Sequence, residues 1–288
     1  MKRGQSMIDQ REKRIEIFND TMKMCRENER LNKAMKNASA GTVLYAADAV
    51  HDLSDAKITE ACKVSVTDER TFQAAKRLLQ EYAGRRATVH NFASATNPGG
   101  GVTSGSNAQE EALCRCSVLY PCLKSEELFK NYYSMHRKRC DVRYTDTCIY
   151  TPDVTVFKSD TSAPEALPEN EWYTVDVITC AAPNLRMRPY NSMNPGKGGA
   201  VSVTDAELME LHIKRGRQVL GAAAANGADV LVLGAFGCGA FRNDPLVVAQ
   251  AYRKLLDEYR QYFENITFAV YCPPDKKENF NIFKRILN

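Results

Sequence analysis

Residues 87–112 read ATVHNFASATNPGGGVTSGSNAQEEA and contain three successive patterns, each typical of a different local structure. The first, at residues 87–93, is rich in apolar and β-branched side chains and predicts a buried strand. The second, at residues 97–108, holds adjacent glycines and small polar residues, which predict a loop. The third is a charged first turn that begins at Gln109 and predicts a helix. A strand, a loop and a helix in this order form a unit of α/β proteins.

The same alternation of strand and helix continues on both sides of this unit. We predict further strands at residues 42–48, 62–66, 147–150, 154–157, 174–180, 229–236 and 266–272. We predict helices at residues 71–82, 126–139, 204–225, from Asp244-Pro245 onward, and at 279–287. The central strands are apolar throughout, as expected when helices cover both faces of a mainly parallel or mixed sheet. The sequence therefore predicts an α/β fold with such a sheet.

The N-terminal region is expected to add helices to this sheet. Apolar side chains recur at roughly helical spacing over residues 6–36, which predicts one helix or two. The loosest stretch, residues 158–170, lies between two apolar runs and is interpreted as a long loop rather than a linker. We therefore expect a single domain over residues 1–288, with residues 1–40 as a helical extension packed on it.

The charge and hydropathy exclude several classes of protein. The net charge of +4 is too small to indicate sequence-specific binding of nucleic acid, although a polyanionic substrate is compatible with it. The basic cluster at residues 136–139 is interpreted as a solvated helix end rather than a binding patch. No run approaches the roughly 20 apolar residues of a membrane span, so no membrane partner is expected.

The ten cysteines indicate a reducing compartment. They are scattered, several lie inside apolar runs, and no Cys-x-x-Cys pair occurs. We therefore expect ten reduced thiols, no zinc site and no other metal. The first residues also lack the apolar core of a signal peptide, so we expect a cytoplasmic protein, or a nuclear one in a eukaryote. No cofactor is implied, and a monomer is expected.

The first glycine loop, residues 97–108, has the composition of a ligand-binding loop. Its adjacent glycines are Gly99, Gly100 and Gly101. Glycines permit positive φ and a close approach of the main chain to a ligand, and their amides suit phosphate or ribose oxygens. Glu110 and Glu111 follow in the first helical turn, where carboxylates either serve chemistry or stabilise the helix dipole. Because the glycines and the carboxylates share one short connection, the functional interpretation is favoured.

A second glycine loop, residues 234–241 (GAFGCGAF), connects a buried strand to a helix start. Backbone amides and a helix dipole at such a place form an anion site. The loop is not a Walker loop, because no Gly-Lys-Ser/Thr follows, and it comes too late in the chain for a Rossmann loop. Cys238 is interpreted as a small buried residue, since no motif links a histidine to it. Phe241 either fills the core or stacks on a base or ribose.

Both loops are expected to open into the same crevice, because they follow the carboxyl ends of strands in one α/β sheet. One loop offers amides for phosphate, and the other offers amides together with carboxylates. The sequence therefore predicts a site for a nucleotide-diphosphate sugar with an acid at one end.

Four segments resemble poly(ADP-ribose) glycohydrolases. The signature of that family is the three glycines, seven further residues, and then Gln109-Glu110-Glu111. The segments similar to its microbial type are NFASATNPGGGVTSGSNAQEEALCRCSVLY (91–120), VTVFKSD (154–160), VDVITCAAPN (175–184) and GAFGCGAFRNDP (234–245). The resemblance spans most of the chain, including the N-terminal helices. It implies a macrodomain-like fold, a three-layer α/β/α sandwich that binds ADP-ribose.

The resemblance also implies a role for each matching residue. The last glutamate of the signature, Glu111, would be catalytic, and Glu110 would bind ribose hydroxyls. Gln109 would hold the loop or the ligand. The residues implied near the distal ribose are Asn97, Gly99, Gly100, Gly101 and Val102. Those implied around the diphosphate are Gly237, Cys238, Gly239 and Ala240, with Phe241 against the ligand.

The implied reaction is a glycoside hydrolysis without metal. Glu111 would give its proton to the leaving ribose oxygen as the C1″ bond breaks, and the ionised carboxylate would then activate water. The expected activity is hydrolysis of ribose–ribose O-glycosidic bonds in poly(ADP-ribose) on modified proteins. Two alternatives stay open: a reader that binds ADP-ribose without catalysis, and a hydrolase of mono-ADP-ribose.

Overall fold

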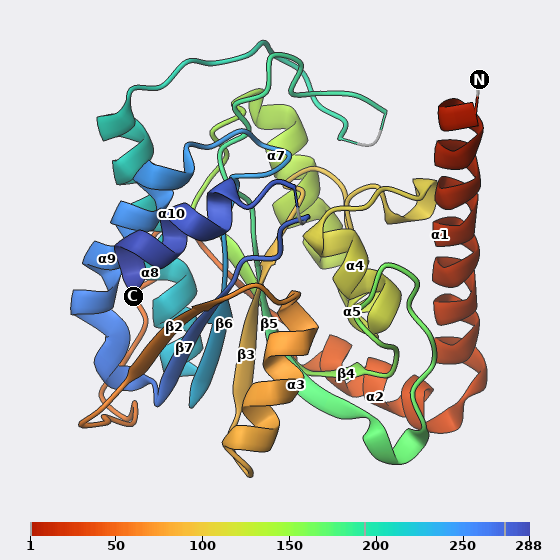
Figure 1. Ribbon diagram of the computed structural model, residues 1–288, viewed down its shortest axis with the longest axis horizontal. Helices are drawn as coiled ribbons and strands as arrows, with labels where there is room; N and C mark the ends of the chain where they lie inside the picture. The colour runs from red at the N-terminus through yellow and green to blue at the C-terminus, as the bar shows by residue number, and fades with distance from the viewer. Residues whose placement is uncertain (1, 193, 274) are drawn as a thin grey trace.

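The structure, a computed structural model, describes residues 2–192, 194–273 and 275–288, and a seven-stranded mixed sheet forms its centre (Figure 1). The strands are β1 (Val43–Tyr45), β2 (Lys63–Thr67), β3 (Ala87–Phe92), β4 (Cys148–Val156), β5 (Tyr173–Cys180), β6 (Val230–Leu233) and β7 (Asn265–Ala269). Their order is β1-β4-β5-β3-β6-β7-β2. The strands from β5 to β2 run parallel, whereas β4 is antiparallel to both of its neighbours. The predicted mixed sheet is confirmed.

Helices cover both faces of this sheet. They are α1 (Lys2–Glu27), α2 (Glu29–Ala40), α3 (Thr71–Glu81), α4 (Gln109–Cys116), α5 (Leu119–Cys122), α6 (Glu126–Leu128), α7 (Ser134–Arg139), α8 (Asp205–Ala225), α9 (Pro245–Tyr259) and α10 (Glu278–Leu287). Shorter segments are η1 (Val102–Ser104), η2 (Phe129–Tyr133), η3 (Glu169–Glu171) and η4 (Arg260–Tyr262). Helices α8, α9 and α10 lie on one side, and α1 to α5 lie on the other (Figure 1).

The central strand β6 shows why two layers of helices are needed. Side chains alternate between the faces of a strand, so each face of a central strand needs its own cover. Val230 and Val232 belong to the core under α3 and α4, whereas Leu231 and Leu233 belong to the core under α8 and α9. All four side chains are at most 1% exposed. The apolar run that the sequence shows here is therefore a strand buried on both faces.

The N-terminal region, for which the sequence predicts one helix or two, forms two helices. The break falls at Asn28, whose side chain accepts a hydrogen bond from the Leu31 amide and so caps α2. Helix α2 packs against β4, and α1 stands beside α4 and η1 (Figure 1).

Two strands predicted at residues 147–150 and 154–157 are one strand, β4. Its register against β5 shifts between Thr151 and Val154, where Pro152 and Asp153 intervene. Asp153 has φ of 50°. In the sequence, a proline followed by an aspartate is typical of the end of a strand. In the structure the two residues form a bulge, and the strand continues after it. The predicted strands at 229–236 and 266–272 also end earlier than expected, at Leu233 and Ala269.

The sheet brings the two glycine loops to one edge. Strands β3 and β6 are parallel neighbours, with Ala87 opposite Val230 and Val89 opposite Val232. The first glycine loop follows β3, and the second follows β6. Both loops therefore leave adjacent strands at their carboxyl ends, where ligands bind in sheets of this kind.

Candidate functional site

One cavity of about 670 Å³ lies at this edge and is lined by both glycine loops. The sequence-predicted residues that line it are Gly100, Gly101, Gln109, Glu110, Glu111, Gly237, Gly239, Ala240 and Phe241. Four others do not line it: Asn97, Gly99, Val102 and Cys238. The structure thus brings together the two carboxylates and both sets of glycines, which the sequence places more than a hundred residues apart.

Glu111 is fixed by two amides of the first glycine loop. The Gly101 amide donates to Glu111 Oε1 at 2.9 Å, and the Ala108 amide donates to Oε2 at 2.7 Å. The residue is 7% exposed and lines the cavity. Each carboxyl oxygen can take part in two hydrogen bonds, so one position on each oxygen remains for a proton or a ligand.

The glycine at position 100 makes this arrangement possible. Gly100 has φ of +58°, and a Cβ there would lie 2.5 Å from Glu111 Oε1 and 3.0 Å from Glu110 Oε2. Gly99 has φ of +66° and faces the ring of Tyr120, where a Cβ would lie 2.6 Å from Cδ2. Both positions therefore require glycine, but for different reasons: Gly100 leaves room for the carboxylates, and Gly99 lets the loop pack on the core.

Glu110 is more deeply buried than its neighbour, at 2% exposure. Its Oε2 accepts a hydrogen bond from the Ser94 amide at 2.7 Å, whereas Oε1 has no hydrogen-bond partner within the described residues. Burial and the nearby charge of Glu111 raise the pKa of Glu110 well above its usual range. A buried oxygen without a partner is costly, so it is suited to a hydrogen bond with a bound ligand.

Gln109 lines the cavity and also makes three hydrogen bonds to the surrounding elements. Its Nε2 donates to the His90 carbonyl at 2.8 Å and to Thr71 Oγ1 at 3.0 Å. Its Oε1 accepts from the Phe92 amide at 2.8 Å. Gln109 therefore fastens the start of α4 to β3 and to the start of α3.

The second glycine loop is anchored mainly at Gly237 and Asn243. Gly237 has φ of +79°, and a Cβ there would lie 2.6 Å from the Ala182 Cβ. Asn243 donates to the Pro183 carbonyl at 2.7 Å, and its Oδ1 lies 2.6 Å from His212 Nε2. Around Gly239, by contrast, a Cβ would meet no atom within 4 Å. The loop is thus fixed at its anchors and open at its tip.

Two details of this loop differ from a simple helix-start anion site. Asp244 caps α9 by accepting hydrogen bonds from the Leu246 and Val247 amides, so the start of the helix is already occupied. The Cys238 amide donates to the Ala235 carbonyl at 3.1 Å, and burial raises the pKa of the Cys238 thiol. The space for an anion therefore lies at Gly239, and the thiol is not poised as a nucleophile.

Phe241 lies between the cavity and the aromatic residues behind it. Its ring packs near Tyr144, with centroids 6.3 Å apart, and also lines the cavity. The guanidinium carbon of Arg186 lies 5.5 Å from the Phe241 ring centroid, which is cation–π range. Arg186 is itself held by Asn184 Oδ1 and the Pro189 carbonyl.

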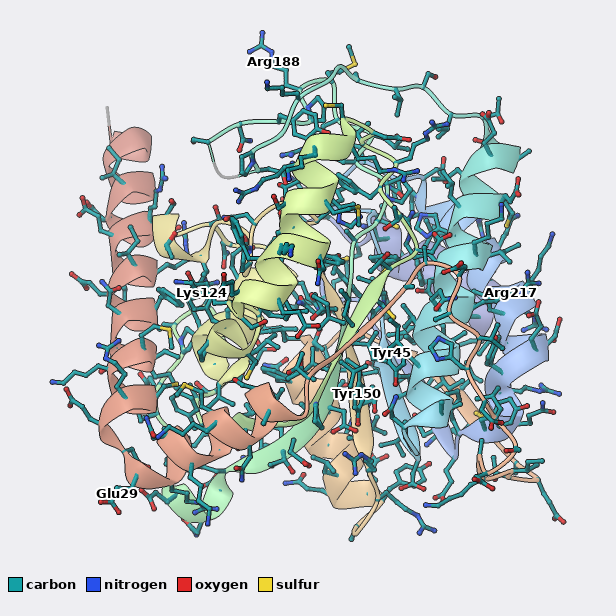
Figure 2. All side chains as sticks on the ribbon, turned by 180° about the vertical axis from the view of Figure 1, so that it is seen from behind. Glu29, Tyr45, Lys124, Tyr150, Arg188 and Arg217 are labelled. Carbon is teal, nitrogen blue, oxygen red and sulfur yellow. The ribbon has the colours of Figure 1, made fainter. Side chains whose placement is uncertain are left out.

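Sequence reasoning missed the strap, the segment between β5 and α8, which lines the cavity through Arg186 and Asn194 and carries Arg188 on its outer side (Figure 2). Asn194 on this strap accepts hydrogen bonds from Ser94 Oγ at 3.0 Å and Thr96 Oγ1 at 2.7 Å. It also lines the cavity. The strap has no regular periodicity, so only the family-like segment at residues 175–184 pointed to its neighbourhood.

The basic cluster at residues 136–139 is not simply a solvated helix end. His136 is 1% exposed, and Arg137 Nε donates to the Thr96 carbonyl at 2.6 Å. Arg137 therefore fastens the segment that leads into the first glycine loop, which corrects the earlier interpretation.

The far end of the cavity has a different character. Tyr271 is half-exposed there, and the guanidinium carbon of Arg70 lies 4.2 Å from its ring centroid. Asp160 lines the same end, is 6% exposed, and accepts a hydrogen bond from the Phe72 amide at 3.0 Å. An aromatic face beside acceptors suits a flat base with N–H donors.

Within residues 2–192, 194–273 and 275–288, no group of three or more histidine, cysteine, aspartate or glutamate side chains is arranged to hold a metal ion. None of the helices in that same part of the chain is long and apolar enough to cross a membrane.

Comparisons with known proteins agree on one family. Residues 12–159 match the model of the microbial-type PARG catalytic domain. The poly(ADP-ribose) glycohydrolase of Thermomonospora curvata bound to the inhibitor ADP-HPD is 33% identical, with a TM-score of 0.78 over 94% of this chain and 98% of that one. The enzyme of Deinococcus radiodurans in complex with ADP-ribose is 36% identical, with a TM-score of 0.71 over 87% and 95% of the two chains. No curated protein sequence matches the chain.

Proposed function

Because the chain belongs to the microbial-type poly(ADP-ribose) glycohydrolases, we propose how its own residues perform the hydrolysis that defines this family. The protein is a glycosidase that hydrolyses ribose–ribose O-glycosidic bonds of poly(ADP-ribose) and releases ADP-ribose. One observation carries the mechanism: Glu111, held by the Gly101 and Ala108 amides, faces the cavity that the second glycine loop also lines.

Each part of the substrate lies beside the residues of the cavity whose chemistry suits it. The terminal ribose sits beside Gly100, where the buried Glu110 offers its unpartnered oxygen to a ribose hydroxyl. The diphosphate sits at the open tip near Gly239, where a Cβ would meet no atom within 4 Å and the main chain can be approached closely. Phe241 covers the ribose, and the base reaches Tyr271 at the far end.

The reaction proceeds by two proton transfers at one carboxyl group. Glu111 gives its proton to the leaving ribose oxygen while the bond from C1″ to that oxygen breaks. The sugar becomes oxocarbenium-like. A water oxygen then bonds to C1″ and loses a proton to Glu111, which restores the starting state. Burial raises the pKa of Glu110, which disfavours a second negative charge beside the ionised Glu111.

The proposal extends to the substrate, the cellular location and the domain organisation of the protein. The substrate is poly(ADP-ribose) on modified proteins, and a monomer stays the expectation for the protein. All ten cysteines are free thiols, which supports a reducing location such as the cytoplasm. Helix α1 contacts η1 and α4, which supports a single catalytic unit that includes the N-terminal extension.

The decisive experiment separates the enzyme from a reader and from a mono-ADP-ribosyl hydrolase. Wild type and Glu111→Ala are incubated with labelled poly(ADP-ribose) and, separately, with mono-ADP-ribosylated protein. We expect wild type to release ADP-ribose from the polymer, and Glu111→Ala to be at least about 10²-fold slower, the usual size of an acid–base contribution. Binding of ADP-ribose without release by either protein would identify a reader. Release only from the mono-ADP-ribosylated protein would identify a mono-ADP-ribosyl hydrolase.

A further inference from the structure

Three consecutive carbonyl oxygens of the first glycine loop each accept a hydrogen bond from a different arginine. The pairs are Arg11 Nε with Ser104 O (2.5 Å), Arg14 Nε with Gly105 O (2.7 Å) and Arg115 Nη1 with Ser106 O (2.7 Å). Two of these arginines come from α1, which is far from the loop in sequence but stands beside it in both views (Figures 1 and 2). The loop is thus braced from outside the sheet.

The contact between α1 and the loop is a close fit. Gly105 has φ of +72°, and a Cβ there would lie 2.5 Å from the Arg11 carbonyl oxygen. The other half of α1 is anchored independently, because Thr21 Oγ1 donates to the Arg115 carbonyl at 2.6 Å and the buried Lys158 pairs with Asp20 at 2.7 Å. Loss of the arginine contacts would therefore leave α1 attached to the domain.

The braced carbonyls lie between the two amides that hold Glu111. Gly101 and Ala108 donate to its two oxygens, and residues 104–106 form the middle of the segment that joins them. A peptide group is planar, so fixing the direction of a carbonyl also fixes the direction of the amide that follows it. The arginines therefore set the path of the chain from one Glu111 donor to the other.

We propose that Arg11 and Arg14 are positioning residues of the hydrolase, through which α1 holds the first glycine loop in the form that orients Glu111. This inference rests on the proposed role of Glu111. Arg11 is exposed, and an exposed hydrogen bond contributes little to the stability of a domain. A small displacement of an acid from its reacting atom, by contrast, lowers the rate strongly.

The test is the double variant Arg11→Ala/Arg14→Ala, measured for kcat and KM on poly(ADP-ribose), for ADP-ribose affinity by calorimetry, and for melting temperature. We expect kcat to fall about 10- to 100-fold, because a displacement of about 1 Å has that effect. We expect KM and Kd to change less than about threefold, because the second glycine loop and Tyr271 still bind the ligand. Lys13→Ala, which removes an exposed charge between the two arginines, is the matched control and should behave as wild type.

Conservative and single variants complete the design. Arg11→Lys/Arg14→Lys keeps both charges and one donor at each position, and should return kcat to within about threefold of wild type. If the double alanine variant does not fold, the single alanine variants decide: a reduced kcat with unchanged Kd in either one supports the proposal. An unchanged kcat in both, or kcat, Kd and melting temperature falling together, overturns it. Inactivity of wild type itself would instead reject the proposed function.

Discussion

The two glycine loops line one cavity but differ in what they present to it. The first is bonded within itself and to its surroundings: the Gly100 amide donates to Asn97 O, the Ser106 amide to Gly101 O, and Glu111 accepts from both ends. The second also has internal hydrogen bonds, from the Cys238 amide to Ala235 O and from the Asn243 amide to Gly237 O, but it is open at Gly239. The first loop carries the carboxylates, and the second offers space for a diphosphate.

This difference matches what each task requires. An acid that transfers a proton must be held in place, because small displacements reduce the rate steeply. A diphosphate needs amides and room rather than a single fixed contact. The dense bonding around Glu111 and the open tip at Gly239 therefore follow from different chemistry, and substitutions in the two loops are expected to have different effects.

The largest difference is expected when alanine replaces one glycine in each loop. In Gly100→Ala, the new Cβ would lie 2.5 Å from Glu111 Oε1 on a backbone with φ of +58°, so the carboxylate must move. We expect kcat on poly(ADP-ribose) to fall by about 10²-fold. Gly239→Ala meets nothing within 4 Å and is the matched control, with activity near wild type. Equal activity of the two variants would contradict the comparison.

A charge at the open tip should affect binding rather than catalysis by the bound enzyme. Gly239→Asp fits the available space, but its carboxylate repels the diphosphate. We expect ADP-ribose affinity to fall about 30-fold, roughly 2 kcal/mol, with an unchanged melting temperature. Calorimetry on this variant beside Gly239→Ala separates charge from size. An affinity equal to that of wild type would remove the second glycine loop from the site.

The buried carboxyl of the first loop predicts a loss of stability with rising pH. The pKa of Glu110 in the folded state is raised above its usual 4.5, so above that pH the unfolded chain releases a proton that the folded state keeps. Unfolding is therefore increasingly favoured as pH rises from about 4.5 towards the folded pKa. Glu110→Gln can still accept from the Ser94 amide and should melt about 4 °C above wild type at pH 7. The two should converge near pH 4; parallel curves would show that Glu110 is ionised in the fold.

The histidines behind the second loop predict the opposite trend. Burial lowers the pKa of His90 to about 3 and that of His212 to about 4, and both rings contact Phe236. The neutral histidines contribute fully to stability above pH 6.5. This contribution is lost as pH falls from 6.5 towards the folded-state pKa values of about 3 and 4. His90→Leu should lose about 2 °C less than wild type in melting temperature between pH 7 and pH 5. An identical loss of melting temperature in the two proteins would show that His90 does not contribute to this pH dependence.

The smallest effect is expected at Cys238. Cys238 does not line the cavity, and burial raises the pKa of its thiol. Cys238→Ala should therefore keep kcat and KM within about twofold of wild type, since a protonated thiol is a poor nucleophile. A loss of kcat as large as that of Gly100→Ala would give the thiol a chemical role.

The sequence predicted what depends on local pattern. Alternating apolar runs gave the strands of the central sheet, and Thr204 and Asp244 marked the starts of α8 and α9. It also placed both glycine loops at one edge, because parallel strands end together. The bulge at Pro152 and Asp153 was read as an interruption, since pairing across it is set by β5 and not by the residues themselves.

The site residues that were missed act through long-range contacts. Asn194 holds Ser94 and Thr96 from a strap a hundred residues away, and Arg137 holds Thr96 from the end of α7. Arg11 and Arg14 brace the first loop from α1. Each is a polar side chain in a segment that looks solvated, and no periodicity distinguishes a braced polar residue from a free one.

The most direct test is a crystal structure of Glu111→Gln with a short ADP-ribose polymer bound. The account predicts that the glycosidic oxygen lies within about 3 Å of the carboxamide at position 111, the range of a hydrogen bond. It also predicts the diphosphate against the main chain at Gly239. A complex with the terminal ribose at the Tyr271 end, and no contact between position 111 and the glycosidic bond, would contradict it.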